Sequence, residues 1–251
     1  MACSIHEVIK IHIRIELIGE NEIRLPLHYN HIVQGFIYKT IDRNLAEFLH
    51  NTGYGEQRKF KLFCFSNLLG KSIIRDNYII FGNRIQLEIS SPDEKFCESF
   101  ANTILKKTVY LGENLLEVGS IEIDRQDVMN NKVTIETLSS ITAYSTLIRP
   151  NGSKYTCYFQ PGEEDFNRIV VENLRKKYKA FTQLDPPNDA VFIKPLTQPR
   201  LHIVKYKGFI VKGYSGRLLL EGPRSLLQMA VDAGLGSKNS QGFGCVEIVK
   251  P

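Results

Sequence analysis

Long hydrophobic runs are missing from the 251-residue chain. The longest, such as Ile79-Ile80-Phe81, are far shorter than the roughly 20 apolar residues that a membrane-spanning helix needs. Residues 1–15 alternate apolar residues with His, Lys and Arg, and they lack the continuous apolar core and the cleavage site of a signal peptide. The sequence therefore predicts a cytoplasmic protein that contacts no membrane.

Disulfide and metal-binding patterns are also absent. The five cysteines are an odd number without a CxxC pair, so neither a disulfide framework nor a zinc site is expected. No HExxH motif, DxD pair or Cys/His cluster with ligand spacing occurs either. We expect a protein without a metal ion or an organic cofactor.

Composition and charge indicate a folded protein with a polyanionic partner. Tryptophan is absent, while hydrophobic residues at 43% and charged residues at 24% are near globular averages. Up to Val133 the chain has 16 Lys and Arg against 17 Asp and Glu, and from Thr134 onward it has 16 against 10. Because Lys and Arg that neutralise phosphates release counterions, the basic second half favours a polyanion. A solvated basic surface would give the same imbalance.

The hydrophobic spacing of the first half predicts the element order βαββαβ. Strict alternation predicts strands, and apolar residues at helical spacing predict helices. The expected strands are residues 6–17, 59–68, 78–90 and 118–128, and the expected helices are residues 29–49 and 91–106. Ser91 as a cap, Pro92 in the first turn and two following acids favour the start of the second helix.

The second half repeats this rhythm. Its expected strands are residues 133–146, 191–195, 200–206, 208–220 and 244–249, and its expected helices are residues 163–181 and 223–233. Two such units predict an α+β fold of two tandem ferredoxin-like domains, the arrangement that RRM-type RNA binders also use. We place the domains at residues 1–133 and 134–251, and we expect a rigid pair with a cleft because no long linker separates them. The fold alone does not decide the function.

The most distinctive motif is the glycine-rich loop at residues 234–244 (GLGSKNSQGFG), of form GxGx5GhG with h hydrophobic. Glycines let successive amides turn toward one point, and Lys238 adds a cation, so the loop can cradle a phosphate. The candidate binding residues are Gly234, Gly236, Ser237, Lys238, Asn239, Ser240, Gly242 and Gly244. The loop follows a helix and precedes a strand, which excludes a dinucleotide fingerprint. A tight helix-to-strand connection would use the same glycines.

A glycine-rich loop just before the last strand of a tandem ferredoxin-like protein resembles the hallmark of the RAMP superfamily. Residues 25–31 (LPLHYNH) and 34–38 (QGFIY) are similar to the first-helix segment of one branch, the CRISPR-associated endoribonucleases that process the transcript of CRISPR repeats. A His at the end of that helix, His50, and a Lys on the next strand, Lys61, also fit. Residues 137–142 (TLSSIT) depart from the family pattern, since Ser140 replaces its Pro. The resemblance covers nearly the whole chain.

This resemblance implies a metal-independent endoribonuclease with catalytic positions Tyr38, His50 and Lys61. Cleavage of RNA by its own 2′-hydroxyl needs a base, an acid for the leaving 5′-oxygen and a cation for the phosphorane. An imidazole suits the base, so we expect His50 as the general base, Tyr38 as the acid or orienting donor, and Lys61 as the electrostatic stabiliser. The products would be a 2′,3′-cyclic phosphate and a 5′-hydroxyl. A half-buried Tyr, a His at a helix end and a solvated Lys are the structural alternatives.

Other histidines compete for the role of general base. His28 and His31 lie at the entrance of the first helix and rank second, because related nucleases differ in where the His lies. His12 and His202 on strands are expected to be structural, and His6 terminal.

Basic residues of the second half supply a further candidate RNA surface. Arg200, Lys205, Tyr206 and Lys207 lie on neighbouring strand segments. Such a basic ribbon with an interleaved aromatic could straddle an RNA stem or stack a base, although an ordinary exposed hairpin has the same pattern. The basic run Arg175, Lys176, Lys177 and Lys179 is expected to be a solvated helix face.

Two other functions stay open. One is a non-catalytic RNA-binding RAMP subunit of a CRISPR interference complex, against which His50 and Tyr38 speak. The other is a ferredoxin-like metabolic or regulatory protein whose loop binds a small anion, against which the basic second half speaks. RNA is the expected partner, and other CRISPR-associated proteins and a second copy of the chain are further candidates.

Overall fold

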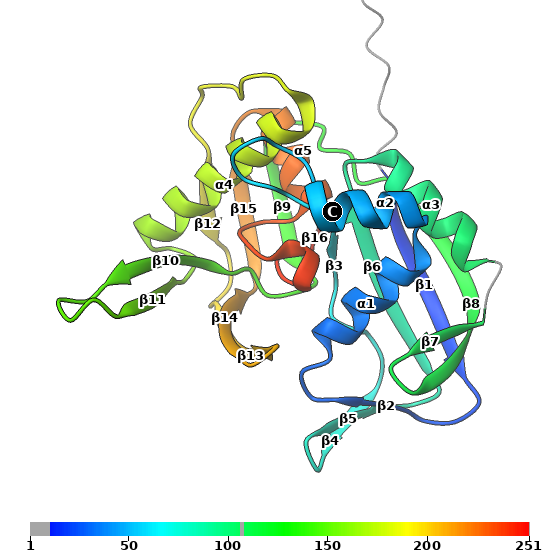
Figure 1. Cartoon of the computed structure of the whole chain (residues 1–251). Helices are drawn as coiled ribbons and strands as arrows, with labels where there is room; N and C mark the ends of the chain where they lie inside the picture. Colours follow the sequence, from blue (N-terminus) through cyan, green and yellow to red (C-terminus); the bar gives the residue numbers. More distant parts are fainter. Residues whose placement is uncertain (1–10, 106–107, 251) are drawn as a thin grey trace, which may run out of the picture.

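The chain folds into two main sheets, each packed against helices (Figure 1). The computed structural model describes residues 11–105 and 108–250. Within these residues, no helix is long and apolar enough to cross a membrane.

The first domain is built on an antiparallel sheet with one apolar face. Its strands, in spatial order, are β3 (Cys64–Phe65), β6 (Arg84–Ser91), β1 (Ile11–Gly19), β8 (Asn114–Asp124) and β7 (Val109–Leu111). Ile13, Ile15 and Leu17 of β1 point to one side because strand side chains alternate, and all three are buried. They share a core with α1 (Asn30–Thr40) and α3 (Glu94–Ile104), which lie in front of this sheet in Figure 1.

The second domain has the same plan. Its sheet has the order β12 (Phe192–Pro195), β15 (Arg217–Glu221), β9 (Lys132–Thr137) and β16 (Val246–Ile248), and all its neighbours are antiparallel. Its helices are α4 (Glu164–Thr182) and α5 (Arg224–Ala233). Phe166, Val170 and Leu174 recur at four-residue spacing on α4, and this stripe is buried in the domain core.

The order of the strands shows which fold each domain has. When each set of four strands in the βαββαβ rhythm is numbered along the chain, both sheets have the order 4-1-3-2, which is β8-β1-β6-β3 in the first and β16-β9-β15-β12 in the second. This is the split βαβ arrangement. The prediction of two tandem ferredoxin-like domains is confirmed.

Additional strands decorate both domains. They are β2 (Ile23–Pro26), β4 (Ser72–Arg75) and β5 (Tyr78–Phe81) in the first, and the hairpins β10–β11 (Ala143–Ile148 and Lys154–Phe159) and β13–β14 (Arg200–Tyr206 and Phe209–Ser215) in the second. Figure 1 shows the β10–β11 hairpin extending away from the second sheet. The β13–β14 hairpin instead contacts α1 of the first domain.

The prediction of one continuous helix over residues 29–49 is wrong. α1 ends at Thr40, and Ile41 is extended with φ −77° and ψ 163°. The Asp42 side chain then accepts hydrogen bonds from the next free amides and starts α2 (Arg43–Glu47), as capping residues do. α2 passes into the π-helix η1 (Phe48–Thr52). His50 therefore lies on a separate element, η1, and not on α1.

Several predicted strands are shorter or divided. Residues 59–68 contribute only β3, because Leu62 has φ +50° and interrupts the extended backbone. The segments 78–90, 133–146 and 208–220 each form two strands, and β8 begins four residues before the predicted strand at 118–128. Residues 6–10 of the first predicted strand and residue 106 at the end of the second predicted helix lie outside the described residues. The domain boundary after Val133 stays a prediction; β9, which it would divide, begins at Lys132.

The two domains share buried contacts. Phe60 and Leu62, which precede β3, pack into the core of the second domain. The Tyr54 ring lies edge-on to Phe181 of α4, with 6.0 Å between centroids. His12 of β1 hydrogen-bonds Asp232 of α5 at 3.4 Å, and both side chains are buried. These contacts pack the two domains against each other.

Candidate active site

Tyr38 lies in the last turn of α1 and is half-buried. Its ring packs edge-on against Phe63, with 5.7 Å between the ring centroids. Burial, with a smaller contribution from the nearby Tyr206, raises the pKa of Tyr38 to about 12. The phenol stays protonated at neutral pH, as an ordinary tyrosine does, so it cannot act as a base there, and the upward shift makes it a weaker acid.

His50 is exposed on η1, the π-helix that follows α2. Its Nδ1 atom lies 2.9 Å from Oδ1 of Asn51. A proton on Nδ1, donated to this amide oxygen, leaves the lone pair on Nε2. In that tautomer the exposed imidazole can accept a proton.

Lys61 is held against the backbone of the same π-helix. Its Nζ donates to the carbonyl oxygen of His50 at 2.9 Å and to that of Leu49. Partial burial lowers the pKa of Lys61. The ammonium thus lies beside His50 and fixes the turn that carries it.

The three predicted catalytic residues are brought to neighbouring elements, with one direct link between them. Lys61 contacts His50 through the backbone, and Phe63, two residues after Lys61, contacts Tyr38. Among the residues that the structure describes, no hydrogen bond joins the Tyr38 hydroxyl to the other two side chains. A substrate phosphate would have to lie between an acid on α1 and a base on η1.

The rival histidines lie at the opposite end of α1. His28 and His31 line an open groove of about 500 Å³ together with Lys205 and Lys207 of the β13–β14 hairpin. At 1.5 Å per helical residue, His31 is roughly 10 Å along the axis from Tyr38. The structure therefore separates the two candidate positions for a base. His12 is buried and His202 hydrogen-bonds Ser215 at 2.7 Å, as expected of structural residues. His6 lies outside the described residues.

The glycine-rich loop packs against α1. Asn30 Nδ2 donates to the carbonyl oxygens of Gln241 and Gly242 at 3.1 and 3.2 Å, and Gln34 Nε2 donates to that of Ser240 at 2.6 Å. Gly242 has φ +85°, and a Cβ there would lie 2.5 Å from the Asn30 amide. Glycine is required at this position because the helix approaches the backbone so closely.

Most of the loop faces the protein interior. Of the eight predicted binding residues, only Lys238 and Ser240 are partly exposed; the buried ones are Gly234, Gly236, Ser237, Asn239, Gly242 and Gly244. The amides of Ser237 and Gly244 donate to the carbonyl oxygens of Thr142 and Ser140, both at 2.9 Å. Lys238 lies over the Tyr144 ring at 5.6 Å. Of the predicted binding residues in this loop, a ligand could therefore reach mainly Lys238 and Ser240.

The prediction that the basic run on α4 forms a solvated face is wrong at Lys177. Its side chain is 2% exposed, and Nζ donates to the carbonyl oxygens of Gly234 at 2.6 Å, Gly236 at 3.2 Å and Ala233 at 3.4 Å. Lys177 continues the buried stripe of Val170 and Leu174 at helical spacing, a signal that the sequence did contain. Lys177 therefore holds the glycine-rich loop through hydrogen bonds to its backbone carbonyl groups.

The buried Lys177 should make stability depend on pH. Burial lowers its pKa to about 7 from an unfolded value of 10.5, so between these values the unfolded chain binds more protons. The free energy of unfolding contributed by this group should rise with pH across that window, by up to about 1.4 kcal/mol per unit, and fall toward pH 7. Denaturant titrations from pH 6.5 to 10 measure it. Lys177→Met should flatten the rise, whereas Lys176→Met, at an exposed position, should keep it. Equal slopes in all three proteins would contradict the prediction.

The β13–β14 hairpin exposes its cations and buries its aromatic residue. Arg200, Lys205 and Lys207 are exposed, whereas Tyr206 is 8% exposed and packs with Phe243. The Tyr206 hydroxyl donates to Oε1 of Gln34 on α1. The hairpin therefore presents a basic edge to solvent while its tyrosine contacts the first domain.

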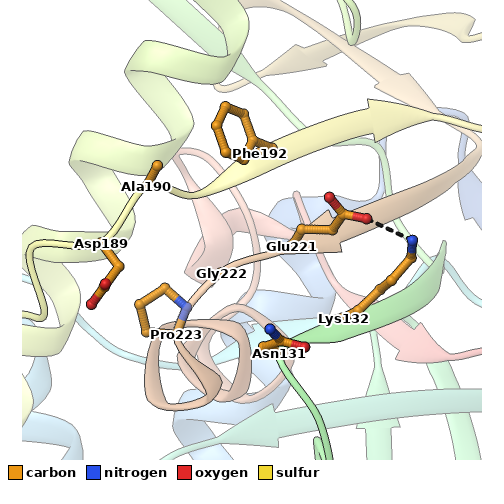
Figure 2. A pocket seen from close by; sticks show the side chains of 8 residues that line it. All are labelled: Asn131, Lys132, Asp189, Ala190, Phe192, Glu221, Gly222 and Pro223. Atoms are coloured by element: carbon orange, nitrogen blue, oxygen red, sulfur yellow. Dashed lines mark ion pairs between the residues drawn. The ribbon is translucent and has the colours of Figure 1, made fainter.

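A second hollow lies on the second domain, away from all these residues. Figure 2 shows its lining, which includes the ion pair of Lys132 with Glu221 at 2.7 Å and the ring of Phe192. Its volume is about 570 Å³. None of the candidate catalytic or loop residues lines it. This hollow therefore lies apart from the predicted catalytic residues on α1 and η1.

Comparisons with known proteins agree with this architecture. The family model described as "CRISPR-associated protein Cas6, N-terminal" matches residues 24–122, and "CRISPR associated protein Cas6, C-terminal" matches residues 123–248. A Methanocaldococcus jannaschii protein named CRISPR-associated endoribonuclease Cas6 1 is 27% identical over 248 residues, which are 95% of this chain and 92% of the relative. A Pyrococcus furiosus protein, CRISPR-associated endoribonuclease Cas6, is 25% identical over 93% of this chain and 88% of its own length.

Solved structures show the same fold over nearly the whole chain. One titled "CRISPR associated protein Cas6" has a TM-score of 0.78 and 25% identity, and it covers 96% of this chain and 100% of its own. Another, of a Cas6-related protein from Pyrococcus furiosus, has a TM-score of 0.83 and 20% identity, with 96% and 99% covered. The family models together span both domains, and the resemblance to the RAMP superfamily is confirmed. The chain belongs to the Cas6 family of CRISPR-associated proteins.

Proposed function

We propose that the protein is an endoribonuclease that cleaves CRISPR precursor RNA within its repeats to give guide RNAs. Relatives that match nearly the whole chain are named CRISPR-associated endoribonucleases, which supports the activity and the substrate class. The observation that carries the proposal is the exposed His50 on a turn held by Lys61, beside a helix that carries a protonated tyrosine. These are the groups that metal-independent RNA cleavage requires.

His50 acts as the general base in this proposal and takes the proton of the 2′-hydroxyl. The 2′-oxygen attacks the adjacent phosphorus, Tyr38 protonates the leaving 5′-oxygen, and the products are a 2′,3′-cyclic phosphate and a 5′-hydroxyl. Lys61 holds the His50 turn through two carbonyl oxygens and adds positive charge near the phosphorane. The raised pKa makes Tyr38 a weaker acid than an ordinary tyrosine, but a phenol is still more acidic than the departing alcohol, so it can protonate the 5′-oxygen.

RNA is bound in this proposal by the exposed cations of the second domain. Lys205 and Lys207 line the groove at the entrance of α1, and Arg200 begins the strand that carries Lys205. Lys238 and Ser240 are accessible residues of the glycine-rich loop. Phosphate contacts of this kind position a nucleic acid without reading its bases. The buried glycines then shape the loop and present its two accessible side chains.

Cleavage should not need a metal ion, because the proposed proton transfers use only side chains. A labelled repeat RNA incubated with the protein in EDTA should be cut at an unchanged rate. Activity lost in EDTA and restored by a divalent ion would overturn the metal-independent mechanism. Binding without cutting would instead favour a non-catalytic RNA-binding subunit, and neither binding nor cutting would favour a protein with another ligand.

Replacing Lys238 with Ala should weaken RNA binding and reduce its salt dependence. One lost phosphate contact should make the slope of log affinity against log salt shallower by about one unit. Filter binding at several salt concentrations measures the slope. Lys176→Ala, which removes an exposed cation of α4, should leave it unchanged. An unchanged slope in Lys238→Ala would show that this cation is only solvated.

A further inference from the structure

Gln34 joins three elements that lie far apart in the sequence. It lies on α1, its Nε2 donates to the Ser240 carbonyl of the glycine-rich loop at 2.6 Å, and its Oε1 accepts from the Tyr206 hydroxyl of the β13–β14 hairpin. Both ends of the amide are therefore used, and both partners belong to the second domain. A side chain with only a donor or only an acceptor could not make both contacts.

Gln34 and Tyr38 are neighbours on the same face of α1. Residues four positions apart on a helix lie one above the other. Tyr206 is near both: its hydroxyl bonds Gln34, and it contributes to the electrostatic surroundings of the Tyr38 phenol. A displacement of Tyr206 therefore acts on the turn of α1 that carries Tyr38.

The β13–β14 hairpin carries Tyr206, which connects it to Gln34 on α1. Tyr206 ends β13 and is flanked by Lys205 and Lys207. Because strand side chains alternate, Lys205 points to the opposite face from Tyr206, whereas Lys207 lies in the hairpin turn with its Nζ 5.9 Å from the centroid of the Tyr206 ring. The cations line the groove at the entrance of α1, whereas the Tyr206 ring is buried against Phe243. RNA held by the lysines would thus fix the position of the tyrosine without touching it.

We propose that Gln34 and Tyr206 form a cross-domain latch that positions Tyr38 for the cleavage reaction. The latch is the pair of hydrogen bonds in which Gln34 accepts from the Tyr206 hydroxyl and donates to the Ser240 carbonyl. It rests on the proposed function, in which Tyr38 is the acid. Both members are positioning residues, since neither touches the reacting atoms, and Tyr206 is not a base-stacking surface.

Tyr206→Phe tests the latch with little disturbance, because it removes one hydroxyl and keeps the packed ring. The single-turnover cleavage rate at saturating protein should fall about 3- to 10-fold, the effect of one hydrogen bond, with RNA affinity nearly unchanged. Tyr158→Phe is a matched control: its hydroxyl donates to the Ile210 carbonyl of the same hairpin at 2.9 Å and, among the described residues, makes no hydrogen bond with α1. It should cut at the wild-type rate. Equal losses in both variants would show a general effect of hairpin stability and overturn the latch.

A double-mutant cycle asks whether the latch acts through Tyr38. In a Tyr38→Phe background, which already lacks the acid, Tyr206→Phe should slow cleavage no further. Full additivity of the two effects, or a wild-type rate in Tyr206→Phe while Tyr38→Phe is slow, overturns the latch and leaves the proposed function intact. A wild-type rate in Tyr38→Phe itself overturns the acid assignment in the proposed function, and the latch with it. Gln34→Leu offers a second route: it removes both hydrogen bonds of the latch, so it should slow cleavage at least as much as Tyr206→Phe, and adding Tyr206→Phe to it should have no further effect.

Discussion

His50→Ala is expected to lower the single-turnover cleavage rate by about 100- to 10,000-fold. A positioned general base contributes a factor of this size, because the proton of the 2′-hydroxyl must leave as the phosphorus is attacked. RNA affinity should change little, since the imidazole acts mainly in the transition state. His50 is exposed, and within residues 11–105 and 108–250 its ring hydrogen-bonds only Asn51, so the loss should not reflect unfolding. Cleavage with excess protein, together with a binding titration, measures both quantities.

His28→Ala and His31→Ala are the controls for this assignment. Both histidines line the groove with Lys205 and Lys207, so these variants can weaken RNA binding without slowing the bound reaction. If either one abolished cutting while His50→Ala cut at nearly the wild-type rate, the active site would lie at the entrance of α1. If all three variants cut normally, a group other than histidine would have to be the base.

The element order of the fold could be predicted from local patterns, but the positions of breaks could not. Alternation in β1 and the stripe on α4 gave the two βαββαβ units because burial on one face repeats with the period of the element. The break at Ile41 was missed because apolar residues continue at helical spacing on both sides of it. Only the cap at Asp42 marks it, and such a cap is a weak local signal.

The candidate site was predictable where resemblance or local chemistry named a residue. The link between Lys61 and His50 connects residues close in the sequence, and the structure brings them together. Gln34 and Tyr206 are 172 positions apart, so their contact depends on how the domains pack. The prediction that Lys177 is solvated is wrong because it rests on the charge of the residue alone. Leu174 and Ala180, three positions before and after it on the helix, are apolar and buried. Cross-domain contacts and buried charges need the tertiary structure.

The glycine-rich loop shows how a binding motif and a structural motif can coincide. Its glycines allow close approach to α1, and its carbonyl oxygens are held by Asn30 and Lys177. Lys238 has a left-handed backbone with φ +63°, and its side chain is partly exposed. The two interpretations considered from the sequence are therefore compatible: the packed glycines build the connection, and the proposed RNA contact is limited to its accessible side chains.

A 2′-deoxy substitution at the cleavage nucleotide is expected to abolish cutting at that site, the largest effect that the proposed mechanism allows. The 2′-oxygen is the nucleophile, so without it His50 has no proton to remove and no cyclic phosphate can form. Binding should be nearly unchanged, because the exposed cations proposed to hold the RNA contact phosphates.

The matched control is the same substitution one nucleotide further along the repeat, which keeps the nucleophile and should be cut normally. Gel analysis of the labelled RNA reports cutting, and a competition titration reports affinity. Cleavage of the deoxy substrate to give a 5′-phosphate would show that water attacks the phosphorus, and the roles of His50 and Tyr38 would then have to be assigned anew. Loss of both cutting and binding would mean that the 2′-hydroxyl is recognised in the ground state, as 2′-hydroxyls are where proteins distinguish RNA from DNA. Only loss of cutting alone agrees with a nucleophile positioned between a base on η1 and an acid on α1.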